Sequence, residues 1–215
     1  MQPSEKCSGD NDAVREKILD AALEILFENG FANLSMRKIA LRANMTAANL
    51  YNYYSNKDEI YMAIQSRGFS LIYQDFKAIQ DQIEDPFIRM QQLVRAYLNF
   101  GLNSADQYDI MFSRNTPKYS DYLGTSIDSM VTAERKAALR VVKIAAQTIG
   151  EMREEPHCSP IEDPEYQAIR LWVALHGIVS LLNARVLDRV DPDIDSTIER
   201  LVCDLMDPFS PKRFT

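Results

Sequence analysis

Apolar residues recur along most of the chain with the 3.6-residue period of amphipathic helices, and no clear run alternates between apolar and polar residues as a strand would. The stretch from Thr125 to Glu154 shows the period well, because Ile127, Val131 and Ala138 fall on one helix face. The pattern predicts an all-α protein. The expected helices cover about residues 12–29, 36–43, 47–54, 57–83, 87–103, 105–113, 125–154, 165–187 and 192–206.

The first three expected helices are close together in the sequence. Asn29 and Gly30 supply a left-handed stop for the first helix. Ser35 and Thr46 stand where N-caps belong for the second and third. Two short helices joined by a turn of a few residues are the helix-turn-helix plan. The residues spaced to form its small core are Ile39, Ala40, Ala43, Met45, Leu50 and Tyr54.

The helices beyond residue 57 are longer. The fourth is expected to start near Lys57, where Ser55 and Asp58 have the spacing of a capping box. This change in helix length predicts the domain organisation. We expect a flexible tail at 1–11, a helix-turn-helix domain at 12–58 and a larger helical domain at 59–215.

The composition limits the place and the chemistry of the protein. Apolar residues make up 46% and charged residues 26%, as in a globular protein with a real core. The amino terminus MQPSEKCSGDND has no apolar signal region, and no run of about 18 apolar residues is available to cross a membrane, so we expect a cytoplasmic protein. The three cysteines and two histidines form no convincing zinc set, and we interpret His157 beside Cys158 as a loop accident. No metal or cofactor is expected.

A positive segment interrupts a chain whose formal net charge is −7. From Leu34 to Lys57 the sequence holds Arg37, Lys38, Arg42 and Lys57 and no acidic residue. A charge run alone is usually a solvated face. Because this one coincides with the predicted helix-turn-helix, it indicates a module that meets nucleic-acid phosphate.

The third predicted helix has side chains suited to a DNA major groove. Ala47 and Ala48 permit close approach and contact with thymine methyl groups, and Asn49 and Asn52 can read an adenine edge. Double-stranded DNA is therefore the expected partner.

Phosphate contacts are expected beside these base contacts. Tyr51 and Tyr53 reach phosphates through their hydroxyls, and Lys57 lies at a helix N-terminus that favours an anion. Aromatic residues at this spacing often simply pack. We accept packing for Leu50 and Tyr54 but not for Tyr53 and Lys57.

The segment ILDAALEILFENGFANLSMRKIALRANMTAANLYNYYSNKDEIYMAI, residues 18–64, resembles the tetracycline-repressor (TetR) family of bacterial transcription regulators. Asn44 departs from the glycine usual in the turn, but Asn tolerates left-handed geometry, so the turn is expected to survive. Ala47 departs from a common lysine or arginine, which removes one phosphate contact. The DNA contacts implied by the resemblance are Ser35, Arg37, Thr46, Ala47, Ala48, Tyr51, Asn52, Tyr53 and Lys57.

The segment WVALHGIVSLLNARVL, residues 172–187, is similar to the W-x-x-x-H-G helix of one TetR carboxy-terminal subfamily. That resemblance implies a homodimer and a small-molecule effector. Aromatic residues suggest the effector pocket, although a lone histidine on an apolar helix is more often a satisfied core residue. The pocket candidates are Tyr97, Phe100, Tyr108, Phe112, Trp172 and His176. The dimer-interface candidates are Ile178, Leu182, Ile194, Ile198, Leu201 and Leu205.

The leading hypothesis is a homodimeric transcriptional repressor that a largely apolar effector releases from its operator. An activator, or a regulator without a small ligand, is the alternative within the same class. An enzyme is not predicted, because the sequence has no glycine-rich phosphate loop, G-x-S-x-G elbow, H-E-x-x-H pair or catalytic Cys/His arrangement. A helical interaction or ligand-carrier protein without regulatory DNA binding is the third possibility.

Overall fold

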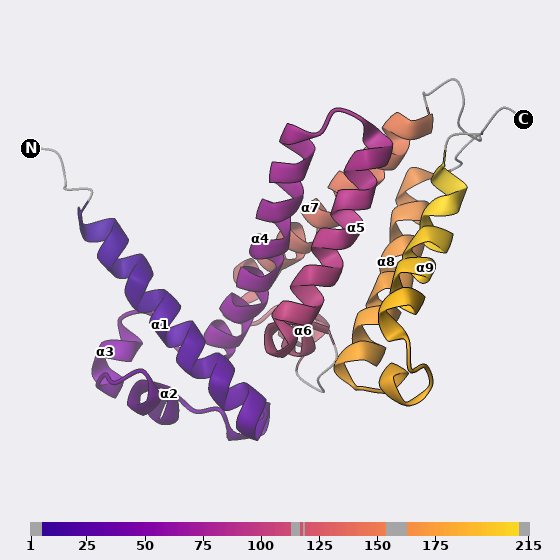
Figure 1. Ribbon diagram of the computed structural model, residues 1–215. Coiled ribbons are helices and arrows are strands. Elements are labelled where there is room, and N and C mark those ends of the chain that lie inside the picture. The colour runs from indigo at the N-terminus through magenta and orange to yellow at the C-terminus, as the bar shows by residue number, and fades with distance from the viewer. Residues whose placement is uncertain (1–5, 113–116, 118, 154–162, 211–215) are drawn as a thin grey trace, which may run out of the picture. The chain divides into compact units, whose positions relative to one another are not determined.

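The computed structural model describes residues 6–112, 117, 119–153 and 163–210 of the 215-residue chain. Within them every regular element is a helix, which confirms the predicted all-α class (Figure 1). The α-helices are α1 (Lys6–Asn29), α2 (Met36–Arg42), α3 (Ala47–Tyr51), α4 (Lys57–Gln82), α5 (Pro86–Asn103), α6 (Ala105–Phe112), α7 (Asp128–Arg153), α8 (Pro164–Asn183) and α9 (Ile194–Met206). Short 3-10 turns are η1 (Phe31–Asn33), η2 (Tyr119–Tyr122), η3 (Leu187–Arg189) and η4 (Asp207–Phe209).

Helix α1 begins at Lys6, so residues 6–11, expected to be a flexible tail, are helical. The apolar period that marks the rest of α1 is missing from these residues. A helix that has already formed extends at little cost per residue even without an apolar face, and this is why periodicity alone missed the start. Helix α3 ends at Tyr51 instead of residue 54.

Helix α8 ends at Asn183, four residues before the predicted end. Arg185 adopts a left-handed φ of 52°. The Arg185 N–H donates to Leu182 O at 2.9 Å and the Val186 N–H donates to Leu181 O at 3.0 Å. This is the hydrogen-bond pattern of a Schellman stop, which usually uses glycine. The sequence carries no sign of this helix stop, because arginine and not glycine occupies the left-handed position.

The N-cap of α4 lies one residue later than predicted. The Glu59 N–H donates to Asn56 Oδ1 at 2.9 Å, and the Glu59 carboxylate accepts from the Ser55 N–H at 2.7 Å. The prediction of Ser55 with Asp58 was therefore wrong. Asn56 is as good an N-cap as serine, and only the observed backbone decides between neighbouring candidates.

The chain forms two compact units. The first combines Met1–Gly68 with Asp109–Arg135 and thus contains all of the described part of the predicted DNA-binding segment. Its core has Ile18, Ile39 and Leu50 fully buried, each with none of its surface exposed. Burial of such side chains holds α1, α2 and α3 together.

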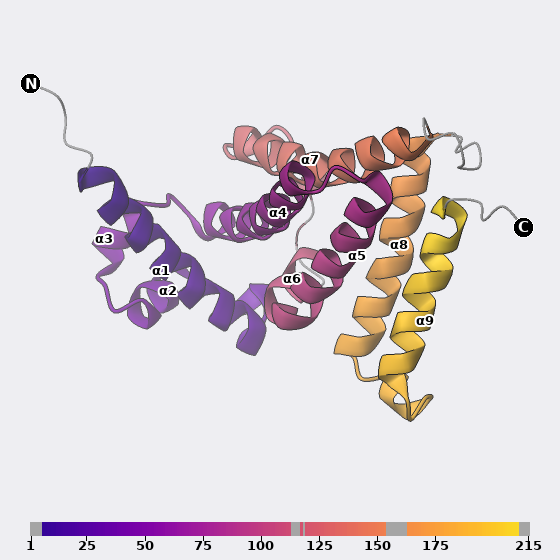
Figure 2. The same ribbon diagram turned by 45° about the horizontal axis from the view of Figure 1, so that its top comes forward.

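The second unit combines Phe69–Tyr108 with Lys136–Thr215. In it α5 lies beside α8, and α8 lies beside α9, in both ribbon views (Figures 1 and 2). Gly101 permits the close approach of α5 and α8, because a Cβ atom there would lie 2.5 Å from Val179 Cγ1. The Asn183 side-chain amide adds a hydrogen bond of 3.0 Å to Gly101 O. Among the described helices, none has the length and apolarity needed to cross a bilayer.

Candidate nucleic-acid interface

Both helices of the predicted helix-turn-helix begin at the predicted N-caps. Ser35 Oγ accepts from the Lys38 N–H at 3.4 Å, and Thr46 Oγ1 accepts from the Asn49 N–H at 3.1 Å. Both hydroxyls satisfy a backbone donor that the helix itself leaves without a partner. Ser35 therefore fixes the start of α2, and Thr46 fixes the start of α3.

The turn between α2 and α3 keeps its left-handed residue without glycine. Asn44 has a φ of 52°. The Asn44 N–H donates to Leu41 O at 3.1 Å, and the Met45 N–H donates to Ala40 O at 2.9 Å. This double hydrogen bond is a Schellman stop with asparagine at the left-handed position. The prediction that the turn survives without glycine is confirmed.

Helix α3 has one buried face and one open face. Leu50 is fully buried and Tyr54 is 4% exposed, which confirms that these two residues pack. Asn49 and Asn52 are exposed and contact each other, with Asn52 Nδ2 donating to Asn49 Oδ1 at 3.5 Å. The open face also presents Thr46, Ala47, Ala48 and Tyr51. Small, amide and hydroxyl groups are thus gathered on one surface, as base contact requires.

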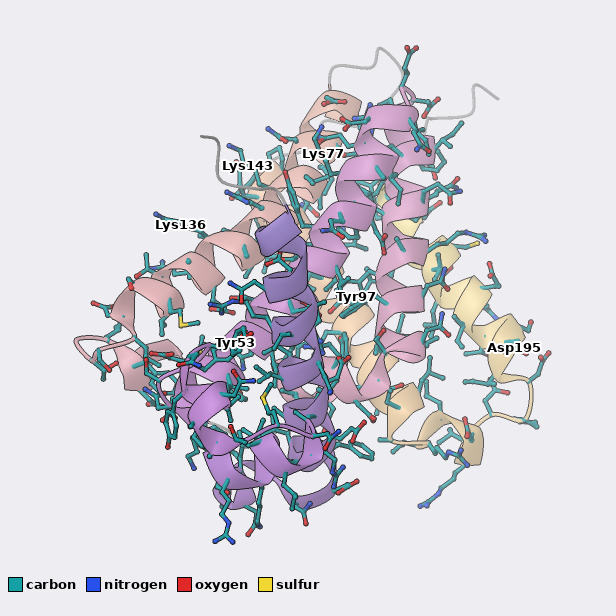
Figure 3. The ribbon with its side chains drawn as sticks, turned by 90° about the vertical axis from the view of Figure 1, so that its left-hand side faces the viewer. Tyr53, Lys77, Tyr97, Lys136, Lys143 and Asp195 are labelled. Atoms are coloured by element: carbon teal, nitrogen blue, oxygen red, sulfur yellow. The ribbon has the colours of Figure 1, made fainter. Side chains whose placement is uncertain are left out.

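The predicted phosphate contacts are packed more than expected. The Lys57 ammonium lies 4.5 Å from the centroid of the Phe31 ring, and the Lys57 side chain is half-buried. Tyr53, labelled in Figure 3, is also half-buried and packs against the core of the first unit. Arg37 on α2 is exposed. The cation–π contact of Lys57 and the packing of Tyr53 restrict where these two side chains point, although both stay partly exposed.

Arg15 of α1 lies beside this surface, although sequence reasoning did not single it out. Its guanidinium carbon is 5.9 Å from the ring centroid of Tyr53 and 5.1 Å from that of Tyr54. Arg15 is more than 35 residues away from these rings in the sequence. No local pattern joins them, so only the folded chain reveals a further cation at this place.

Arg42 does not contribute to the positive segment as predicted. Its guanidinium donates to the Glu24 carboxylate at 2.8 Å and to the Glu28 carboxylate at 2.9 Å. Hydrogen bonding to Arg42 lowers the pKa of Glu28, and the bond to Glu28 raises the pKa of Arg42. The two carboxylates come from α1, outside the acid-free segment. The charge of Arg42 is therefore neutralised by α1. Within the positive segment, the cations that remain for phosphate are Arg37, Lys38 and Lys57.

A second group of candidates meets in the second unit. Trp172 Nε1 donates to the Tyr97 hydroxyl at 2.9 Å, and the hydroxyls of Tyr97 and Tyr108 are 2.9 Å apart. The Tyr108 hydroxyl lies 2.6 Å from His176 Nδ1, and His176 Nε2 lies 3.4 Å from Ser180 Oγ. Figure 3 labels Tyr97 on α5. We call these five residues the polar chain.

The polar chain has a consistent direction when His176 is neutral. Indole nitrogen is only a donor, so the Tyr97 oxygen accepts from Trp172. Tyr97 then donates to Tyr108, Tyr108 donates to His176 Nδ1, and the Nε2–H donates to Ser180. Burial lowers the pKa of His176, which favours this neutral form. Burial raises the pKa of Tyr97 to about 12 and raises that of Tyr108 as well, so both hydroxyls keep their protons.

The structure thus brings together four of the six predicted effector-pocket residues. Phe100 joins them through its ring, 6.4 Å from the centroid of Tyr108. Phe112 is half-buried at the end of α6, in the segment that belongs to the first unit. Trp172 is 38% exposed, so the polar chain starts near solvent.

Comparison with known proteins decides which class this arrangement belongs to. A model of bacterial regulatory proteins of the tetR family matches residues 18–64. A model of the tetracyclin repressor-like C-terminal domain matches residues 90–205, more than half of the chain.

The chain belongs to the TetR family.

It is accordingly a DNA-binding transcriptional regulator and not an enzyme. The narrower resemblance to the W-x-x-x-H-G subfamily stays a prediction.

Relatives of this TetR-family protein carry regulator names. It is 22% identical over 198 residues to an uncharacterized HTH-type transcriptional regulator of Haemophilus influenzae, covering 90% of this chain and 87% of that protein. It is 30% identical over 80 residues to the transcriptional repressor KstR of Rhodococcus jostii, covering 37% of each chain. The chain spans less than half the length of four of the six curated relatives that match.

The fold of the TetR-family protein also matches solved structures. A fatty acid degradation regulator, FadR from Bacillus halodurans, superimposes with a TM-score of 0.69 at 14% identity, covering 99% of this chain and 100% of that one. At this identity the likeness shows the fold alone.

The predicted dimer-interface residues of the TetR-family chain differ in exposure. Ile178 is 7% exposed and belongs to the chain's own core, whereas Leu201 is 36% exposed. The other four, Leu182, Ile194, Ile198 and Leu205, are half-buried. A more exposed apolar row runs along α8, which the prediction missed because it selected positions from apolar spacing alone. This α8 row consists of Tyr166, Ile169, Val173, Gly177 and Leu181.

The metal prediction can be compared only in part. Among the described residues, no group of three or more His, Cys, Asp or Glu side chains is arranged to hold a metal ion. His157 and Cys158 lie outside the described residues.

Acid should weaken the second unit through His176. Because burial lowers the pKa of His176 from its ordinary 6.5, the unfolded chain binds this proton more tightly than the folded chain. The contribution to the free energy of unfolding is therefore present above the unfolded pKa and is lost as pH falls toward the folded pKa. We expect the thermal midpoint of the wild type to fall more between about pH 7 and pH 5.5 than that of His176→Asn. Equal pH dependence of the two proteins would contradict this expectation.

Proposed function

We propose that this TetR-family protein is a cytoplasmic, homodimeric, sequence-specific repressor that a small, largely apolar effector releases from its operator. The open face of α3 carries the proposal. Its amide and hydroxyl side chains are exposed together, while Leu50 holds the opposite face in the core. A surface of this kind suits the major groove, where base edges present donors and acceptors.

The side-chain chemistry of this surface separates base contacts from phosphate contacts. Asn49 and Asn52 can form paired hydrogen bonds with an adenine edge, which specify sequence. Arg37 and Lys57 supply positive charge for phosphates, which gives affinity without sequence preference. The hydroxyls of Ser35, Thr46, Tyr51 and Tyr53 are further candidates for phosphate contacts. The exposed methyl groups of Ala47 and Ala48 allow the close approach that these contacts need.

Two substitutions test the DNA contacts. The probe is the duplex that the wild-type protein selects from random-sequence DNA, with binding measured by fluorescence anisotropy at several salt concentrations. Lys57→Ala should weaken binding to all duplexes alike and make the salt slope shallower by about one. Asn52→Ala should relax preference at particular base pairs, by about 1–3 kcal/mol if the contact is bidentate.

Lys143→Ala is the matched control, because it removes the same charge from an exposed position of α7 in the second unit (Figure 3). It should change neither quantity. An unchanged salt slope in Lys57→Ala removes Lys57 from the phosphate contacts. Failure of the wild-type protein to enrich any sequence argues against the proposed function itself.

The α8 row supports the proposed homodimer. Tyr166 is 58% exposed, Val173 61% and Leu181 43%, so three apolar side chains of one helix face water. Gly177 lies among them in the helix interior, where glycine costs about 1 kcal/mol relative to alanine. A Cβ atom at Gly177 would meet nothing within 4 Å in its own chain. A glycine that the protomer does not need is explained by close approach of a partner helix.

Gly177→Leu tests the homodimer. A Cβ atom at Gly177 meets no atom of the protomer within 4 Å and leucine favours a helix more than glycine does, so we expect folding to be unchanged or improved. We expect the wild type to sediment with the mass of two chains, and the variant to dissociate at concentrations where the wild type does not. Lys143→Leu adds the same side chain to α7 and should leave the dimer intact. A monomeric wild type contradicts the homodimer, and a Gly177→Leu dimer of unchanged affinity moves the interface away from the α8 row.

The polar chain and the aromatic rings around it support the proposed effector site. A largely apolar site with a few convergent polar groups suits a small amphiphilic ligand. Trp172 is the partly exposed end of the chain. The fatty acid degradation regulator among the matching structures makes fatty acids and their derivatives the first compounds to test.

Thermodynamic reciprocity gives the test of release. A compound that raises the thermal midpoint should lower operator affinity, typically about 5–150-fold, and operator DNA should weaken binding of the compound by the same factor. Trp172→Ala, if it remains folded by circular dichroism, should lower the affinity for the compound more than the affinity for the operator. Stabilisation without any loss of operator affinity would contradict release.

A further inference from the structure

Residues from the middle of the chain complete the core of the DNA-binding unit. Ile110 and Val131 are fully buried in the same core as Ile39 and Leu50 of the helix-turn-helix. Tyr122 and Ile127 belong to this core as well, at 7% and 4% exposure. The segment Asp109–Arg135 is thus part of the unit that presents α3, although it is distant in sequence.

Tyr122 makes a directed polar contact from this segment. Its hydroxyl donates to Asp58 Oδ1 at 2.9 Å. Burial, followed by the hydrogen bond to Asp58, raises the pKa of Tyr122, so the phenol remains a donor. The Tyr122 carbonyl accepts from Thr125 Oγ1 at 2.7 Å and from the Thr125 N–H at 3.1 Å. Backbone and ring are therefore both held.

Asp58 is the second residue of α4 and directly follows Lys57. The first turn of α4 is also held by its N-cap, because Asn56 Oδ1 accepts from the Glu59 N–H. The hydrogen bond from Tyr122 adds a constraint from a different part of the chain to the same turn. It restricts the direction in which α4 begins, and with it the position of the Lys57 ammonium over Phe31.

We propose that Tyr122 is a positioning residue for operator binding: its hydrogen bond to Asp58 holds the first turn of α4 so that Lys57 meets the DNA backbone. The inference rests on the proposed DNA-binding function. It assigns to the segment Asp109–Arg135, which the carboxy-terminal family model includes, a direct part in the geometry of the DNA contacts.

The test uses the full chain and the duplex selected by the wild-type protein. Tyr122→Phe keeps the buried ring and removes the hydroxyl. We expect operator affinity to fall roughly 3- to 10-fold, the usual worth of one hydrogen bond, and the salt slope to become shallower by about one as the Lys57 contact loosens. Circular dichroism and thermal melting confirm that each variant is folded at the binding temperature.

Thr148→Val is the matched control. It removes a buried hydroxyl that donates to Ile144 O at 2.9 Å, from α7 in the second unit. It should lower the thermal midpoint without changing the salt slope. Tyr122→Phe with the operator affinity and salt slope of the wild type would leave Tyr122 a purely structural residue and overturn the proposal.

Asp58→Ala provides an independent arm with the tyrosine unchanged, which also decides the matter if Tyr122→Phe does not fold. Removing an acid near phosphate would by itself strengthen DNA binding. The proposal instead predicts weaker binding with a shallower salt slope, and no further effect of Tyr122→Phe in this background. Stronger binding by Asp58→Ala overturns the proposal. A wild type that selects no duplex removes the proposed function and this inference together.

Discussion

Helices of seven and five residues, such as α2 and α3, are too short to be stable on their own in water. Their existence depends on burial of Ile39 and Leu50 in a core that α1 and α4 also line. The N-caps at Ser35 and Thr46 and the left-handed Asn44 then fix where each helix begins and ends. The side chains proposed to read DNA are the ones that this core does not bury, and the packing of Leu50 places them together on the opposite face of α3.

The second unit depends on a different requirement, the pairing of buried polar groups. Tyr97 and Tyr108 place hydroxyls among apolar side chains, where an unmet hydrogen bond is costly. The polar chain resolves this by linking donors and acceptors from α5, α6 and α8. Gly101 contributes to this pairing, because it lets α5 come close enough to α8 for these hydrogen bonds to form. The close packing at Gly101 and the hydrogen bonds of the polar chain therefore require the same arrangement of α5 against α8.

Local sequence signals predicted the features that arise from local physics. The helix-turn-helix, its two N-caps and the tolerance of Asn44 all depend on residues within a few positions of one another. Several of the misses depended on contacts between residues far apart in the sequence. The sequence predicted that Arg42 was a free cation, but in the folded chain it pairs with Glu24 and Glu28 of α1. The contacts of Arg15 with Tyr53 and of Tyr122 with Asp58 join residues far apart in the sequence. Local periodicity therefore could not predict them. Arg185 showed a different limit, since a left-handed arginine gives no signal comparable to glycine.

The DNA-binding unit is discontinuous in sequence, and this has a consequence for recombination and protein engineering. A single crossover near residue 58 would join the helix-turn-helix of one relative to the Asp109–Arg135 segment of another. The hybrid would then contain a mismatched core, because its α1, α2 and α3 would meet an α4 and a middle segment in which Ile110, Ile127 and Val131 are replaced by residues that never packed against these three helices. A chimera that exchanges operator specificity therefore has to carry two pieces of the chain, Met1–Gly68 and Asp109–Arg135, from the same parent.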